Sequence, residues 1–176
     1  RLLNTGDKYL YQNGFYYAYS DDQSGETSWK NHQGTPISLP LRDTQEIFVF
    51  EPGDLVQTIQ KDKVFMVRGF DWTVTDRGDV HIIGLVKDNQ YNVTKKVHTY
   101  KPAGAKEFIT TTDFSGASTL YTFGNNIYII GLNRSGRVFI EKSEGGTNNF
   151  IKIYEAKSGI RFRHGKAHIN EGKLYY

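Results

Sequence analysis

Apolar and polar positions along the chain follow the pattern of a β protein. Short aromatic or β-branched runs at residues 15–19 and 46–50 are bounded by turn residues such as Gly, Asn and Pro. Further strands are predicted at 9–11, 64–67 and 106–110. No long window keeps apolar residues three and four positions apart, so no helix is predicted.

One run departs from simple alternation. Residues 81–86, His-Ile-Ile-Gly-Leu-Val, are almost continuously apolar. A strand that is packed on both of its faces has this composition. We therefore expect this strand to lie between two layers.

The segment around this run returns twice. Residues 75–85 align with 122–132 and then with 170–176, at a constant spacing of 47 residues, so that His81, Tyr128 and Tyr175 are equivalent. Each copy reads as a strand, a tight turn rich in Gly and Asn, and a second strand. A period in the forties with several strands per unit is typical of a β-propeller blade, with a plain antiparallel meander as the alternative.

The predicted fold is therefore an all-β β-propeller, with residues 1–176 forming a single propeller fragment. Blades follow the 47-residue repeat from about residue 57 onward, which gives about three to four blades. The chain starts at Arg1, has Met66 as its only methionine, and stops at Tyr176 inside a predicted strand. An unpaired edge strand invites aggregation, so we expect further blades of a longer parent chain as partners.

Composition narrows the function classes. The chain of 176 residues is 38% hydrophobic, which suits one domain with a real core. A net charge of +3 without a basic stripe argues against a nucleic-acid partner. The absence of cysteine excludes disulfides and thiolate metal ligands. No apolar run approaches the roughly 18 residues of a membrane-spanning helix, so no membrane partner is expected.

A second motif occupies residues 20–29, Ser-Asp-Asp-Gln-Ser-Gly-Glu-Thr-Ser-Trp. It resembles the Asp-box, S-x-D-x-G-x-T-W, with one extra residue before the glycine and one before the tryptophan. The carboxylate of Asp22 is expected to accept backbone N–H bonds across a hairpin turn, while Gly25 takes a special backbone angle and Trp29 packs beneath. Asp22 is thus assigned a structural role, and residues 143–150 contain a weaker echo of the motif.

Residues 16–41 resemble a segment of BNR-repeat propellers of the polysaccharide lyase kind, the best known being ulvan lyases. Residues 76–82 are similar to the motif that opens a later blade, with Val80 where proline is usual. The resemblance implies a seven-bladed propeller, secreted or periplasmic, that cleaves an anionic, uronate-containing polysaccharide by β-elimination. A carbohydrate-binding or sialidase-like glycosidase propeller remains the alternative.

A lyase of this kind needs two chemical functions. The proton at C5 of the uronate becomes acidic only when the neighbouring carboxylate is neutralised by Arg, a metal ion or a protonated acid. A base such as His, Tyr or Lys must then remove it. The resemblance places much of the catalytic set in blades that precede this chain, so it transfers no catalytic residue. The cofactor stays open, with a structural or charge-neutralising divalent metal as one option.

The repeat offers a separate way to find a site. The three copies differ at residues 68–71, 115–118 and 162–165, at the ends of the inner strands, where a propeller binds ligands. Positions that vary while the strands match are free to serve a site. The candidates are Arg163 and His164 as catalytic residues and Arg68, Asp71 and Trp72 as substrate-binding residues, because cations suit an anionic sugar and Trp can stack on its ring. The structural alternative is that Arg68 pairs with Asp71 and Trp72 is blade core.

The remaining histidines are predicted to be scaffold or to lack a role. His81 and His168 fall on strand positions of the repeat, and His98 has no identifiable partner. His164 and His168 are four residues apart, about 13 Å on a strand, which is too far for one metal ion. A metal site would need residues that are distant in sequence.

Overall fold

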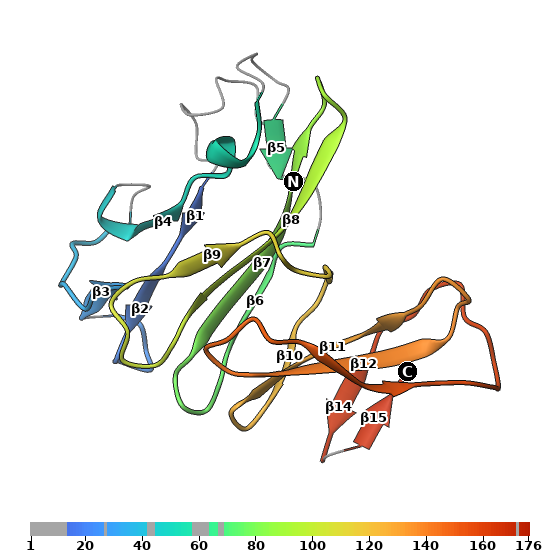
Figure 1. The fold of residues 1–176 in the computed structure, drawn as a ribbon. Coiled ribbons are helices and arrows are strands. Elements are labelled where there is room, and N and C mark those ends of the chain that lie inside the picture. The colour runs from blue at the N-terminus through green and yellow to red at the C-terminus, as the bar shows by residue number, and fades with distance from the viewer. Residues whose placement is uncertain (1–13, 27, 42–44, 58–63, 67–68, 172) are drawn as a thin grey trace.

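The computed structural model describes residues 14–26, 28–41, 45–57, 64–66, 69–171 and 173–176. All regular elements among these residues are strands, apart from two short 3-10 helices. Figure 1 shows three parts in chain order: a small N-terminal part, a first large sheet, and a second large sheet followed by a hairpin. None of the described helices is long and apolar enough to cross a membrane.

The first sheet is antiparallel and has five strands: β5 (Val64–Met66), β6 (Asp71–Val74), β7 (Val80–Asp88), β8 (Val93–Lys101) and β9 (Ile109–Thr111). β5 and β6 pair with opposite ends of β7, so together they form one interrupted edge. β7 then pairs with β8 over its full length, and β8 with β9.

The second sheet is an antiparallel meander of four strands: β10 (Tyr121–Phe123), β11 (Asn126–Leu132), β12 (Val138–Glu144) and β13 (Ile151–Glu155). The pairing of β12 with β13 shifts register between Ile140 and Glu141. A separate hairpin follows, formed by β14 (His168–Asn170) and β15 (Lys173–Tyr175).

The N-terminal part contains two small antiparallel pairs. β1 (Phe15–Tyr16) pairs with β4 (Phe48–Phe50), and β2 (Ala18–Ser20) pairs with β3 (Trp29–Asn31). The 3-10 helices are η1 (Gln45–Ile47) and η2 (Pro52–Leu55). η2 is capped by the Glu51 carboxylate, which accepts a bond from the backbone N–H of Gly53 at 2.9 Å.

The first sheet is packed on both faces. One face meets the N-terminal part through Phe15, Val80, Ile82, Val86 and Val97. The opposite face meets the second sheet in a cluster formed by Ile83, Phe114, Leu120 and Ile129. Full burial of such a side chain stabilises the fold by about 1.5–3 kcal/mol. The prediction that residues 81–86 form a strand between two layers is confirmed.

The repeat is present as three hairpins, and its register is partly as predicted. The equivalence of His81, Tyr128 and Tyr175 holds, because they pair with Thr73, Tyr121 and His168 respectively. The strands before the turns slip by one residue in the first copy, where Thr73 rather than Val74 is equivalent to Tyr121.

The slip comes from the turns. The first hairpin closes with three residues, since the Gly78 N–H donates to Thr75 O and the Thr75 N–H donates to Asp79 O. Gly78 has a φ of 95°, which suits the last position of such a turn. The second and third hairpins close with two residues.

Several predicted boundaries were wrong or untested. The strand at 46–50 begins only at Phe48, because η1 precedes it and buries Ile47 against the core. The strand predicted at 106–110 lies at Ile109–Thr111, since exposed Lys106 and Glu107 stay outside the ladder. The predicted strand at 9–11 and the last residue of 64–67 lie outside the described residues.

Candidate functional site

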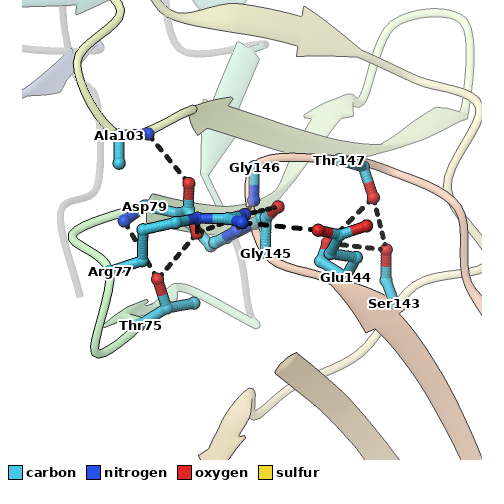
Figure 2. Close-up of polar contacts among 10 residues, drawn as sticks. Thr75, Arg77, Asp79, Ala103, Ser143, Glu144, Gly145, Gly146 and Thr147 are labelled. Atoms are coloured by element: carbon cyan, nitrogen blue, oxygen red, sulfur yellow. Dashed lines mark hydrogen bonds and ion pairs between the residues drawn. The ribbon is translucent and has the colours of Figure 1, made fainter. Parts of the chain in front are cut away.

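The most extensive polar contact joins the two large sheets. Figure 2 shows the turn after β6 meeting the turn between β12 and β13. The Arg77 guanidinium donates to Asp79 and to the Gly145 carbonyl oxygen, at 3.1 and 2.9 Å. It also lies 3.4 Å from Glu144. Asp79 accepts further bonds from the Ala103 N–H and the Thr75 hydroxyl, both at 2.8 Å.

Asp79 is held as a buried carboxylate. Burial would raise its pKa, but bonds from the Ala103 N–H, Thr75 and Arg77 together lower it below the usual range. A side chain at Gly145 or Gly146 would collide with the Asp79 carboxylate. Both oxygens of the Asp79 carboxylate accept bonds from the protein and the side chain is 1% exposed, so we interpret this contact as an inter-sheet clamp rather than a ligand site.

A buried histidine pair lies beside the clamp. His81 and His98 are fully buried, and His81 Nδ1 lies 2.9 Å from His98 Nε2. The Gly146 N–H donates to His81 Nε2 at 2.9 Å, and His98 Nδ1 lies 2.6 Å from Asn148 Oδ1. The prediction that His81 is a packed scaffold position is confirmed. No partner for His98 is identifiable in the sequence, and the structure shows two. They are His81, 17 residues away in the chain, and Asn148, 50 residues away.

These contacts fix the protonation of both rings. Since His81 Nε2 accepts a bond, its proton lies on Nδ1 and is donated to His98 Nε2. The proton of His98 then lies on Nδ1 and is donated to Asn148. Desolvation lowers the pKa of His81 to about 3, with repulsion from His98 adding to it, and desolvation lowers that of His98 to about 4. Two neutral, fully partnered rings are structural groups and are poor general bases.

Two of the three predicted substrate-binding residues lie on one edge strand. Asp71 and Trp72 are both in β6, and Arg68 lies outside the described residues. The Asp71 carboxylate accepts a bond from the Leu120 N–H at 2.8 Å, so it links β6 to the chain that enters β10. Trp72 is the next residue along β6, so its side chain lies on the opposite face of the sheet, and it is 58% exposed. Trp72 thus has the access that ring stacking requires, whereas Asp71 has a structural partner.

Two equivalent connections join successive sheets. The first connection, residues 112–120, runs from β9 to β10, and the second connection, residues 156–167, runs from β13 to β14. The repeat places 115–118 over 162–165. The predicted catalytic residues Arg163 and His164 form a bend in the second connection, and both are exposed. They lie side by side in the chain and far from Asp71 and Trp72 in the sequence.

The second connection is strongly basic. It contains Lys157, Arg161, Arg163, His164 and Lys166 and no Asp or Glu, and all five side chains are exposed. Arginine and lysine bind carboxylates and sulfates through charge-assisted hydrogen bonds. The sequence analysis predicted only Arg163 and His164 among these residues, because it compared the three copies only at residues 68–71, 115–118 and 162–165.

The Asp-box-like segment forms a turn between β2 and β3. The Asp22 carboxylate accepts bonds from the N–H of Ser24 at 3.0 Å and from its hydroxyl at 2.7 Å. Gly25 has a φ of 69°, and the Trp29 indole N–H donates to its carbonyl oxygen at 2.8 Å. These are the contacts predicted for a structural turn. Within the described residues, no group of three or more His, Asp or Glu side chains could hold a metal ion.

Several known proteins that resemble this chain in sequence are ulvan lyases. No protein-family model matches the chain. It is 51% identical over 180 residues to the long isoforms of ulvan lyase from Alteromonas sp. (strain LOR) and from Pseudoalteromonas sp. (strain PLSV). It is 47% identical over 180 residues to the short isoform of ulvan lyase from Alteromonas sp. (strain LOR). Each alignment covers 100% of this chain.

The structure agrees with the sequence comparison. It superposes on a crystal structure of a polysaccharide lyase with a TM-score of 0.86 and 49% sequence identity, over 97% of this chain. The chain covers 36% of that lyase, 34% of the short ulvan lyase and 18% of each long one. The match is therefore to one part of proteins that are considerably longer.

Proposed function

We propose that this chain is part of a polysaccharide lyase that cleaves an ulvan-like, uronate-containing polysaccharide by β-elimination. The observation that carries the proposal is identity near 50% to ulvan lyases over the whole chain. The structural similarity to a polysaccharide lyase at TM-score 0.86 supports it independently of any single motif.

The proposed architecture is a β-propeller fragment of about three to four blades, within a seven-bladed parent whose other blades are its partners. The first and second sheets are consecutive antiparallel meanders, and the β14–β15 hairpin begins a third unit in the same register. The BNR and Asp-box assignment of residues 20–29 belongs to this proposal, supported by the turn contacts of Asp22.

The chemistry can be assigned to two residues. The Arg163 guanidinium would neutralise the uronate carboxylate and make the C5 proton acidic. The His164 imidazole would accept that proton while the bond from C4 to the leaving oxygen breaks, and the leaving oxygen takes up a proton from solvent. Exposure of both side chains and their adjacency in one bend support these roles. Arg68 and Trp72 remain predicted substrate contacts. Asp71 also remains one, although its carboxylate already accepts a bond from the Leu120 N–H.

A hydrolytic propeller is less well supported. A retaining glycosidase needs a pair of carboxylates about 5 Å apart or a tyrosine nucleophile. Asp71 is the single carboxylate among the varied loop positions, and it bonds to the Leu120 N–H. Because the polymer substrate is too large to cross a membrane, the proposal also places the protein outside the cytoplasm, secreted or periplasmic.

Ultraviolet absorbance tests the proposal. β-Elimination leaves a double bond between C4 and C5 that is conjugated to the carboxylate and absorbs, whereas hydrolysis creates no such bond. We expect absorbance to rise when the full-length protein is incubated with ulvan. Release of reducing ends without any rise would identify a hydrolase and overturn the lyase assignment.

A further inference from the structure

The second connection is built so that its charged side chains face outward. The Phe162 ring packs on the Tyr176 ring with centroids 5.3 Å apart. The backbone N–H of Phe162 donates to the Gly136 carbonyl oxygen at 2.7 Å. A side chain at Gly165 would come within 2.6 Å of the Tyr176 ring, so only glycine permits this approach. Phe162 and Gly165 therefore anchor the connection, while Arg161, Arg163 and Lys166 remain exposed.

The anchoring contact brings in another basic residue. Phe162 is bonded to the turn between β11 and β12, in which Arg134 is exposed. A Cβ at Gly136 would lie 2.5 Å from the Phe162 carbonyl oxygen, so this turn touches the connection directly. Arg134 thus extends the basic surface beyond the connection itself.

The acidic residue that directly precedes the second connection is already engaged. Glu155, at the end of β13, accepts bonds from Lys152 and from Asn133, at 2.8 and 2.5 Å. Among the described residues, no ion pair is formed by the cations of the connection. Several cations without carboxylates among them repel one another, which costs stability unless an anionic ligand is bound.

We propose that Lys157, Arg161, Lys166 and Arg134 form a binding strip, flanking Arg163 and His164, that holds several successive charged units of an anionic polysaccharide. The ligand class follows from the side chains, because lysine and arginine bind carboxylate and sulfate groups and these exposed cations are spread over residues 157–166 and the turn bonded to Phe162. The identity of the polymer rests on the proposed function, whereas the strip rests on the geometry of this chain.

The strip gives a definite role to residues outside the chemistry. Each exposed cation contributes little alone, because water and salt screen its charge. Several acting along one polymer add affinity and fix which sugar unit reaches Arg163 and His164. Binding through such contacts weakens as salt screens them.

Affinity electrophoresis in gels containing ulvan tests the strip on full-length protein. The double variant Arg161→Gln, Lys166→Gln is compared with Lys95→Gln, Lys106→Gln, which removes the same charge from exposed positions on or beside the first sheet. We expect the strip variant to bind ulvan roughly five-fold more weakly, while the control binds as wild type and neutral dextran retards none of them.

The outcomes separate the two proposals. Equal weakening in both double variants, or none in either, would overturn the strip, as would equal retardation by neutral dextran. If ulvan retardation depends on Arg161 and Lys166 but no ultraviolet absorbance develops, the strip stands and the lyase assignment falls. If absorbance develops and the strip variant binds as wild type, the lyase stands and the strip falls.

Discussion

The first and second connections occupy equivalent places in the repeat and differ in packing and in charge. In the first connection, Phe114 and Leu120 are buried between the two sheets. The Ser115 carbonyl oxygen accepts a bond from Lys96 at 2.5 Å, and the Ser115 hydroxyl donates to Glu141 at 3.0 Å. Both apolar and polar groups of this segment are thus used to hold the sheets together.

The second connection has few such contacts. Its anchors among the described residues are Phe162, Gly165 and two backbone groups. The Ala156 N–H donates to the Val138 carbonyl oxygen at 2.9 Å, and the Ala167 carbonyl oxygen accepts a bond from the Tyr121 hydroxyl at 3.1 Å. Where the first connection has Gly116 and Ala117, the second has Arg163 and His164. The same position of the repeat is therefore packed in one copy and exposed and charged in the other.

Truncating the anchoring rings should separate the connections most clearly. We expect Phe114→Ala to lower the free energy of unfolding by about 3–5 kcal/mol, because it opens a cavity between the sheets. Phe162→Ala, the matched change in the second connection, should cost about 1 kcal/mol, since its ring is only half-buried. Urea denaturation measures the free energy of unfolding of both variants. Equal losses would contradict the claim that the first connection is more tightly packed than the second.

Acid should weaken the packed region through the histidine pair. Both folded-state pKa values lie below the ordinary 6.5, so the unfolded chain binds protons first as pH falls. Stability is complete above about pH 6.5 and declines as pH falls from there towards 4 and 3, by up to about 1.4 kcal/mol per pH unit for each histidine.

Urea midpoints measured from pH 7.5 to pH 4 give that slope. His98→Gln removes one of the two titrating rings and should make the slope shallower, whatever it does to stability at neutral pH. Lys166→Gln in the second connection should leave the slope as it is. A wild-type protein whose stability does not change over this range would contradict the neutral, buried pair.

The exposed bend of the second connection should affect turnover and not stability. Arg163→Ala and His164→Ala are each expected to lower kcat on ulvan by roughly 100-fold, because charge neutralisation and proton removal are lost. The free energy of unfolding should change by less than about 0.5 kcal/mol, as for other exposed substitutions. Initial rates of absorbance increase report kcat, with Lys95→Ala as control, and unchanged rates would remove both residues from the mechanism.

Asp71 gives a smaller but discriminating effect. Asp71→Ala leaves the Leu120 N–H without its acceptor, so we expect a loss of about 1–3 kcal/mol in unfolding free energy. Affinity for ulvan should stay unchanged if the contact is purely structural. Weaker ulvan binding with intact stability would instead support the predicted role of Asp71 as a substrate contact.

Period and strand patterning predicted much of the fold. The three hairpins and the doubly packed β7 follow from turn residues and from a continuous apolar run, which are local signals. The one-residue slip before the first turn was missed, because a three-residue turn and a two-residue turn look alike when both contain Gly.

The polar contacts were harder to predict. His98 depends on His81 and on Asn148, which is 50 residues away, and Asp79 depends on Ala103. Such pairs arise only when two sheets pack, and no local pattern in one sequence reveals them. The basic residues of the second connection are visible in the sequence. The sequence alone does not distinguish them from ordinary exposed charges; the contrast with the equivalent first connection, which the structure shows to be packed, does.

Hydrogen exchange of the full-length protein, with and without an ulvan oligosaccharide, tests the contrast most directly. We expect backbone amides of residues 157–166 to exchange more slowly when the sugar is bound. Amides of 113–120 should exchange slowly in both states, because they lie in the packed connection. Protection that appears at 113–120, or sugar binding that leaves 157–166 unchanged, would contradict the assignment of the second connection as the site.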